Sequence, residues 1–224
     1  MTAALLLALV VTQTPLDAGT FVIRQDTVEI GRETFQLSSI PFGASEAGCR
    51  ITAEARYSGG HGAVLLEPTV DIGPDTEPLS VSYEIARARE PLRIRGQRSR
   101  GRFTMRYLSP HSERAREYPM SGPTVILDDS VFSLYIFAGW RVGLPGRGLD
   151  VGIIVPRADR REMATVEELA PGPTSLNGGT AALRHVRLTG GANQVVHLWF
   201  DRRGLLQKVE IPSRHLVVER VPPA

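Results

Sequence analysis

The residue types that carry most protein chemistry are scattered along this chain of 224 residues. Its five histidines are far apart, and no two have the i, i+2 or i, i+4 spacing of a local metal site. Only His185 and His197 are placed so that adjacent strands could bring them together. The chain also lacks the G-x-S-x-G turn of a nucleophilic serine and the G-x-x-x-x-G-K-[ST] phosphate loop. We therefore predict no catalytic residue, no metal ligand and no cofactor.

The acidic pairs and the single cysteine have structural interpretations. Asp128-Asp129 precedes an apolar run, so one of these side chains can cap a helix by accepting an orphan backbone N–H. Glu167-Glu168 is typical of a solvated surface. Cys49 is expected to be a small buried thiol. A lipid anchor at Cys49 is excluded because Glu46 stands where a lipoprotein signal needs an apolar residue.

Arginine is concentrated in the middle of the chain. Ten arginines lie between Arg87 and Arg116, where only Glu90 and Glu113 oppose them, although the whole chain has a net charge of +2. The simpler interpretation is that these arginines cover a solvated outer face of a sheet, in a protein whose genome favours arginine over lysine. The sharper one is a surface for anionic lipid headgroups or an acidic partner, because arginine binds carboxylate and phosphate in a two-pronged way. The candidate residues are Arg93, Arg95, Arg100, Arg102 and Arg106. We expect Arg100, Arg102 and Arg106 to share one strand face, and Arg93 and Arg95 to line up likewise.

Most of the chain shows the two-residue hydrophobic period of β-strands. Phe103, Met105 and Tyr107, for example, share one face of a predicted strand. The other expected strands are Thr20–Glu29, Glu33–Ile40, Arg50–Tyr57, Ala63–Asp71, Leu79–Ala88, Leu149–Val155, Met163–Leu169, Ala181–Leu188, Gln194–Phe200, Leu205–Ile211 and His215–Val221. Asp201-Arg202-Arg203-Gly204 predicts a hairpin turn. The length suits one β domain, residues 19–224.

One segment, Asp128–Trp140, breaks this rhythm because apolar residues cover nearly all of its sides. A helix of this composition must be buried, so we predict one buried helix near residues 128–141. A buried strand is the competing interpretation. The aromatic side chains proposed to line a core or a ligand cavity are Phe132, Tyr135, Phe137, Trp140 and Trp199.

The N-terminal segment predicts export. Ala3–Val11 is an uncharged apolar run of nine residues, too short to cross a membrane as a helix but typical of a secretory signal peptide. We expect residues 1–18 to be that signal, with cleavage at Ala18 and a periplasmic or secreted product. A buried first strand or helix of the domain is the alternative. Export and the low aromatic content of 6% argue against a nucleic-acid partner.

Both ends of the expected domain show a resemblance. Gly19-Thr20-Phe21 with Ile30-Gly31-Arg32-Glu33-Thr34-Phe35, and the closing segment from Leu198 to Arg220, resemble the terminal strands of certain uncharacterised periplasmic families. Those families look similar in fold to the bacterial lipoprotein-carrier half-barrels. The resemblance implies a mainly β fold: one large curved antiparallel sheet, an open or half barrel, with the helix in its concave face. It carries no catalytic residue across.

Three functions follow as expectations. The first is a non-enzymatic exported protein that binds an apolar or amphipathic ligand, such as a lipid or acyl chain, in the concave face. The second is a structural or adaptor protein of the cell envelope that docks an acidic partner through the arginine-rich face, with peripheral membrane contact as a further option. The third is a hydrolase whose site is built from distant residues.

Overall fold

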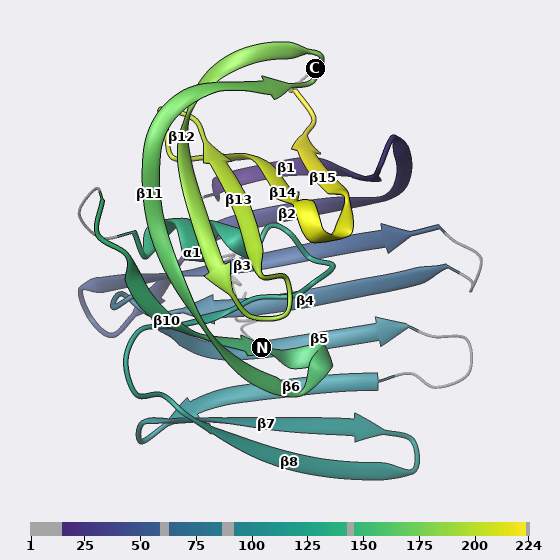
Figure 1. The fold of residues 1–224 in the computed structure, drawn as a ribbon. Helices are drawn as coiled ribbons and strands as arrows, with labels where there is room; N and C mark the ends of the chain where they lie inside the picture. Colours follow the sequence, from purple (N-terminus) through teal and green to yellow (C-terminus); the bar gives the residue numbers. More distant parts are fainter. Residues whose placement is uncertain (1–14, 59–62, 87–91, 143–145, 223–224) are drawn as a thin grey trace, which may run out of the picture.

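The computed structural model describes residues 15–58, 63–86, 92–142 and 146–222. Within these ranges the fold is mainly β, with fifteen strands in one sheet and one α-helix (Figure 1). The strands are β1 (Pro15–Gln25), β2 (Val28–Phe42), β3 (Glu46–Tyr57), β4 (Val64–Ile72), β5 (Pro78–Ala86), β6 (Leu92–Ser99), β7 (Arg102–Ser109), β8 (Ser112–Pro119), β9 (Thr124–Ile126), β10 (Leu149–Val155), β11 (Arg160–Leu176), β12 (Gly179–Gly190), β13 (Val195–Phe200), β14 (Leu206–Ile211) and β15 (Leu216–Arg220). The helix is α1 (Tyr135–Trp140), and two 3-10 turns are η1 (Pro156–Ala158) and η2 (Pro212–Arg214).

The sheet is continuous and open. Its strand order is β8-β7-β6-β5-β4-β3-β2-β1-β15-β14-β13-β12-β11-β10-β9, so β8 and β9 are its edges. Figure 1 shows the sheet curling around α1. The predicted curved, mainly β sheet is confirmed. The expectation that it is antiparallel throughout is wrong at one edge, because β9 and β10 pair in parallel. The chain crosses through α1 between these two strands, and a connection of that length permits parallel pairing.

Side chains alternate between the two faces of the sheet, as strand geometry requires. Phe103, Met105 and Tyr107 face the core with exposed fractions of 3% or less, as predicted. Arg102 and Arg106 on the same strand are exposed. The inner, concave face therefore carries the hydrophobic core, and the outer, convex face meets solvent.

The segment that follows β9, residues 127–140, lies inside the curve of the sheet, and we call it the inner segment. The predicted burial is confirmed, because residues 131–138 all belong to the buried part of the molecule. The predicted helical start at Asp128 is wrong, because α1 begins only at Tyr135 and has no side-chain cap. Asp128 forms an isolated bridge with Val131 and accepts the N–H of Ser130 at 2.8 Å. That contact is an Asx turn, which competes with a helix for the same backbone groups.

The hairpin of β11 and β12 is longer than the sequence predicts. Its tip reaches β14 and β15, which lie two and three strands away from β12 in the sheet. Asn177 Nδ2 donates to the carbonyl oxygen of Arg220 at 2.9 Å, and Lys208 Nζ donates to that of Ser175 at 3.2 Å. A register shift between Leu169 and Gly172 accompanies this curl, as expected of a β-bulge. The predicted turn after β13 is present, with Gly204 at φ 78°.

Strand β1 begins at Pro15, so the first described residues already belong to the sheet. Asp17 is nearly buried, and both of its carboxylate oxygens accept hydrogen bonds from Arg220, one of them from Nη1 at 3.1 Å. Most of the predicted signal peptide lies outside the described residues, but Pro15, Asp17 and Ala18, near its expected end, pair with β2. Among the described helices, none is long and apolar enough to cross a membrane.

Candidate functional site

The concave face is the first candidate site, because three of the five aromatic residues predicted to line a core or a cavity lie there. Phe132, Tyr135 and Phe137 are at most 2% exposed and pack into the hydrophobic core. The void that borders Tyr135 has a volume of about 20 Å³, which is room for roughly one water molecule. The side chains of the inner segment therefore fill the space at this position.

Trp140 and Trp199 are placed differently. Trp140 ends α1 and is 39% exposed, with its ring edge-to-face against Phe137 at 5.3 Å. Trp199 lies on the outer face, because its strand neighbours Leu198 and Phe200 point into the core. The expectation that Trp199 lines the concave face is wrong, since β13 turns every second side chain outward. The five aromatic candidates therefore do not surround one cavity.

On the outer face Trp199 joins the two histidines that the sequence suggested could meet. His185 Nε2 lies 2.9 Å from His197 Nδ1, and the ring of Trp199 stacks on His185 with centroids 4.8 Å apart. Lys208 Nζ lies 5.1 Å from the centre of the Trp199 ring. Burial, followed by the neighbouring imidazole, lowers the pKa of His185. No group of three or more metal-binding side chains occurs among the described residues.

Glu33 is a buried acid of the concave face. It lies on β2 with an exposed fraction of 0%. Its two carboxylate oxygens accept the backbone N–H groups of Phe132 at 2.6 Å and Ser133 at 2.9 Å. Burial raises the pKa of Glu33 to about 7, although these hydrogen bonds act in the opposite direction. The Glu33 side chain therefore binds the backbone of the inner segment just before α1.

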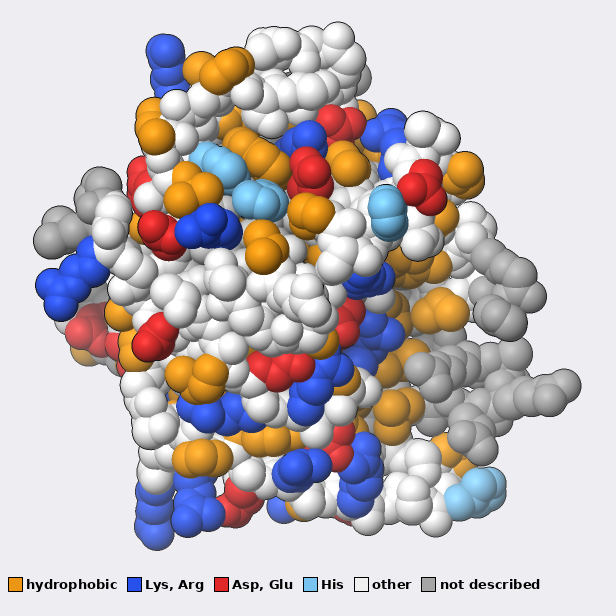
Figure 2. Space-filling view, viewed as in Figure 1, with side chains coloured by type: hydrophobic (Ala, Val, Ile, Leu, Met, Phe, Trp, Pro, Cys, Tyr) orange, Lys and Arg blue, Asp and Glu red, His pale blue; other side chains and the backbone are white. Residues whose placement is uncertain are grey.

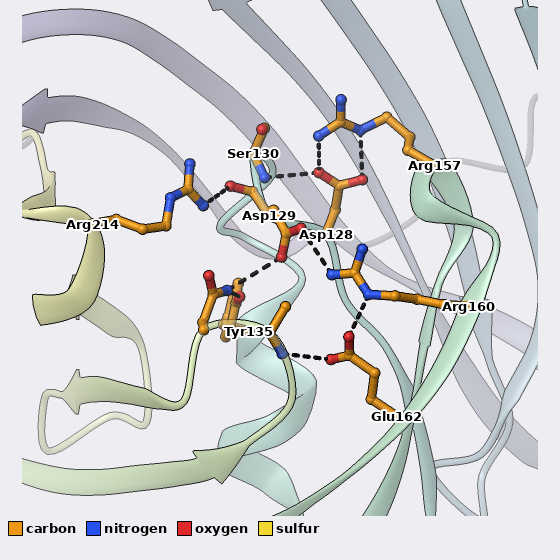
Figure 3. A network of polar contacts seen from close by, with 10 residues as sticks. Asp128, Asp129, Ser130, Tyr135, Arg157, Arg160, Glu162 and Arg214 are labelled. Carbon is orange, nitrogen blue, oxygen red and sulfur yellow. Dashed lines mark hydrogen bonds and ion pairs between the residues drawn. The ribbon is translucent and has the colours of Figure 1, made fainter.

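A second polar cluster holds the start of the inner segment (Figure 3). Arg157 binds Asp128 through two parallel hydrogen bonds of 2.7 and 2.6 Å, and the Asp128 side chain is 0% exposed. The next residue, Asp129, accepts from Arg160 at 3.1 Å through its side chain and from Arg214 at 2.7 Å through its carbonyl oxygen. Such two-pronged contacts fix orientation as well as charge.

The far end of the inner segment is tied down in the same manner. Arg141 follows α1 and is only 10% exposed as a side chain. Its Nη2 atom lies 2.6 Å from a carboxylate oxygen of Glu77 and 2.7 Å from the carbonyl oxygen of Thr76. Both residues belong to the turn between β4 and β5. Ion pairs at or next to both ends, and Glu33 in the middle, therefore bind this segment to the sheet and to its connecting turns.

The arginine-rich strands form the second candidate site. Figure 2 views β7 and β8 from their inner side and shows basic and acidic side chains interleaved in the lower part of the view; the following ion pairs lie on the outer side. Arg93 pairs with Glu84 at 2.5 Å and Arg102 with Glu117 at 2.6 Å, whereas Arg106 lies 3.7 Å from Glu113. Carboxylates of neighbouring strands therefore offset much of the charge that the sequence places here.

Arg95 and Arg100 differ from these paired arginines. Neither has an ion pair with another residue in the described ranges. Arg100 lies in the turn between β6 and β7 with φ 47°, so the expectation that it shares a strand face with Arg102 and Arg106 is wrong. The chain must reverse between two strands at this point. Arg93 and Arg95 do lie together on the outer face of β6, as predicted.

A hollow of about 710 Å³ opens beside Arg95 on the outer face of β5, β6 and β7. We call it the outer hollow and define it by the polar residues Ser80, Ser82, Arg95, Gln97, Thr104 and Arg106. Ser80 Oγ is engaged with Asp71 at 3.0 Å. The remaining side chains present mainly hydrogen-bond donors, so the outer hollow suits an anionic group.

Neither a protein-family model nor a curated protein sequence matches this chain. Among solved structures, the crystal structure of a β-barrel-like protein of domain of unknown function DUF1849 from Brucella abortus is similar. It covers 91% of this chain and 96% of its own, with a TM-score of 0.52 and 9% sequence identity. The fold is β-barrel-like. At this identity the likeness concerns the fold alone.

The sequence interpretation missed two buried or half-buried residues that hold the inner segment, Glu33 and Arg157. Glu33 had a usable signal, because it occupies an inward position of its strand, in phase with Phe35 and Leu37. A charged residue among inward apolar residues must have partners. Arg157 had no such signal, because it lies in the turn η1, and its partner Asp128 is 29 positions away.

Proposed function

We propose that this protein is a non-enzymatic, exported adaptor of the cell envelope that docks an acidic protein partner at the outer hollow. One observation carries the proposal: Arg95 lines a donor-rich hollow and has no ion pair with a carboxylate among the described residues. A guanidinium in this position can bind an incoming carboxylate with two parallel N–H bonds.

The neighbours of Arg95 support the same partner chemistry. Arg106 stands across from it on β7, directly paired in register, and its own carboxylate contact is long at 3.7 Å. Gln97, Ser82 and Thr104 add neutral donors to the same hollow. An acidic side chain that enters between Arg95 and Arg106 would therefore form ion pairs with the arginines and hydrogen bonds with the neutral donors.

The concave face supports an apolar or amphipathic ligand less well. The inner segment occupies it, and its aromatic side chains are already packed against the core. A lipid or acyl chain would have to displace this segment, together with the bonds from Glu33, Arg157 and Arg141. We therefore assign the binding role to the outer face.

A fluorescent peptide of consecutive glutamates tests the docking site, with the affinity measured by anisotropy at low salt. Replacing Arg95 and Arg106 together by glutamate should weaken binding at least tenfold, because attraction becomes repulsion at the centre of the site. The matched control replaces Arg32 and Arg56, which are 57% and 67% exposed on β2 and β3, by glutamate. This control changes the net charge equally.

The comparison of the two double variants decides the result. The proposal requires the control to bind within about twofold of the wild-type chain. Equal losses in both variants would mean that the peptide senses net charge alone, and the outer hollow would then not be a site. Vesicles of anionic phospholipid form a second arm, and tighter binding to them than to the peptide would replace the protein partner by a membrane surface.

A further inference from the structure

The two edges of the sheet differ in access. Strand β9 is three residues long and wholly buried. Strand β8 has eight residues, of which Tyr118 alone is buried, and it pairs only with β7 among the described strands. In an antiparallel strand every second residue directs its N–H and C=O groups away from the neighbour. Strand β8 therefore presents a row of backbone donors and acceptors to solvent.

The side chains of β8 carry opposite charges on its two faces. Arg114 and Arg116 lie on the inner side, where both contact Asp159 and the Arg114 guanidinium lies 4.2 Å from the centre of the Tyr107 ring. Glu113 and Glu117 lie on the outer side, beside Arg106 and Arg102. All four side chains are more than half exposed, so they remain within reach of a partner.

This arrangement disfavours a second copy of the chain. Residues 113–117 read Glu-Arg-Ala-Arg-Glu, which is the same in both directions. Symmetric antiparallel pairing of two copies about Ala115 would place Arg114 of one copy opposite Arg116 of the other. It would likewise place Glu113 opposite Glu117. Like charges directly opposite each other destabilise a strand pair, so the edge is protected against self-association.

We propose that β8 binds an extended segment of another protein, which adds to the sheet as a further strand and whose side chains alternate between acidic and basic. Its acidic side chains face Arg114 and Arg116, and its basic side chains face Glu113 and Glu117. Backbone hydrogen bonds supply the contact, and charge alternation supplies the selectivity, as in other strand-addition complexes. This surface borders the outer hollow at the contact between Glu113 and Arg106, but its backbone groups belong to β8 and lie outside the hollow.

Two peptides of the same length as β8 test the proposal on the full chain. One alternates lysine and glutamate, and the other contains the same residues as a lysine block followed by a glutamate block. The alternating peptide should bind about tenfold more tightly, because only its charges match both faces. Amide hydrogen exchange should show new protection in β8.

Charge substitutions locate the site. Replacing Glu113 and Glu117 by lysine should weaken binding of the alternating peptide about tenfold. The matched control replaces Glu54 and Glu67, on the outer faces of β3 and β4, by lysine and should bind normally. Equal binding of the two peptides, or protection confined to other strands, would overturn the proposal. A dimer protected at β8 without peptide would also overturn it, because the occupant would then be a second copy.

Discussion

The inner and outer faces of the sheet use the same residue types under different conditions. On the inner face, Asp128 and Arg157 pair with side chains that are 0% and 20% exposed. On the outer face, Arg102 and Glu117 pair with side chains that are 65% and 52% exposed. A buried pair that loses one partner leaves an uncompensated charge, whereas an exposed pair is solvated and screened. The inner pairs therefore fix the inner segment, and the outer ones remain available to partners.

The largest effect is expected at the buried pair. Replacing Arg157 by methionine leaves the Asp128 carboxylate buried without its cation and should lower the free energy of unfolding by about 3–5 kcal/mol. Urea unfolding, followed by tryptophan fluorescence, measures this change. A loss below about 1 kcal/mol would place this pair with the exposed ones and would break the distinction between the faces.

The pH dependence of stability tests Glu33. Its folded-state pKa is about 7, above the ordinary value of 4.5, so the folded protein binds this proton more tightly than the unfolded chain. The associated stability is fully present below about pH 4.5 and is lost as the pH rises through about 7. Replacing Glu33 by glutamine should remove a decline of about 3 kcal/mol across that window. Parallel stability profiles of variant and wild type would contradict this assignment.

Asp17 tests whether the same distinction holds at the start of β1. Its side chain is 5% exposed and that of Arg220 is 11% exposed. Replacing Asp17 by asparagine should cost about 2 kcal/mol, because Arg220 loses a charged acceptor. A chain that begins at Gly19 should be destabilised at least as much, since it also loses the pairing of Pro15–Ala18 with β2. If that shorter chain were as stable as one that begins at Pro15, Asp17 would have no role in the fold.

The smallest effect is expected on the outer face. Replacing Arg102 by alanine removes its exposed pair with Glu117 and should change the free energy of unfolding by no more than about 1 kcal/mol. Raising the salt concentration should reduce even this difference, because exposed charges are screened. A loss comparable to that of the Arg157 variant would show that the outer pairs are part of the stabilising framework.

Local periodicity was sufficient to predict much of the fold. Alternation identified the buried face of β7, and the Asp-to-Gly pattern identified the turn before β14. The polar contacts of the inner segment were harder to predict, because they join positions that are far apart in the sequence. Glu33 reaches Phe132 across 99 positions. Asp128 has the residue type of a helix cap, but the competing Asx turn and Arg157 decide its geometry.

The charge of the central strands shows the same limit. In the sequence, the segment from Arg87 to Arg116 has an excess of positive charge, because only the two acids within that segment are set against its arginines. In the fold, Glu84 on β5, Glu117 on β8 and Asp159 after η1 all supply carboxylates. Pairing of this kind depends on strand register, which a periodic pattern does not specify. Arg95 stands out only after these partners are known.

Native mass spectrometry of the full chain, purified without detergent, tests the central claim most directly. If the inner segment fills the concave face, the spectrum should show the mass of the polypeptide alone. Brief incubation with a fatty acid should add no stable adduct. A protein that carries an acyl chain or lipid from its host, and loses it only on unfolding, would contradict the claim. The concave face, and not the outer one, would then be the binding site.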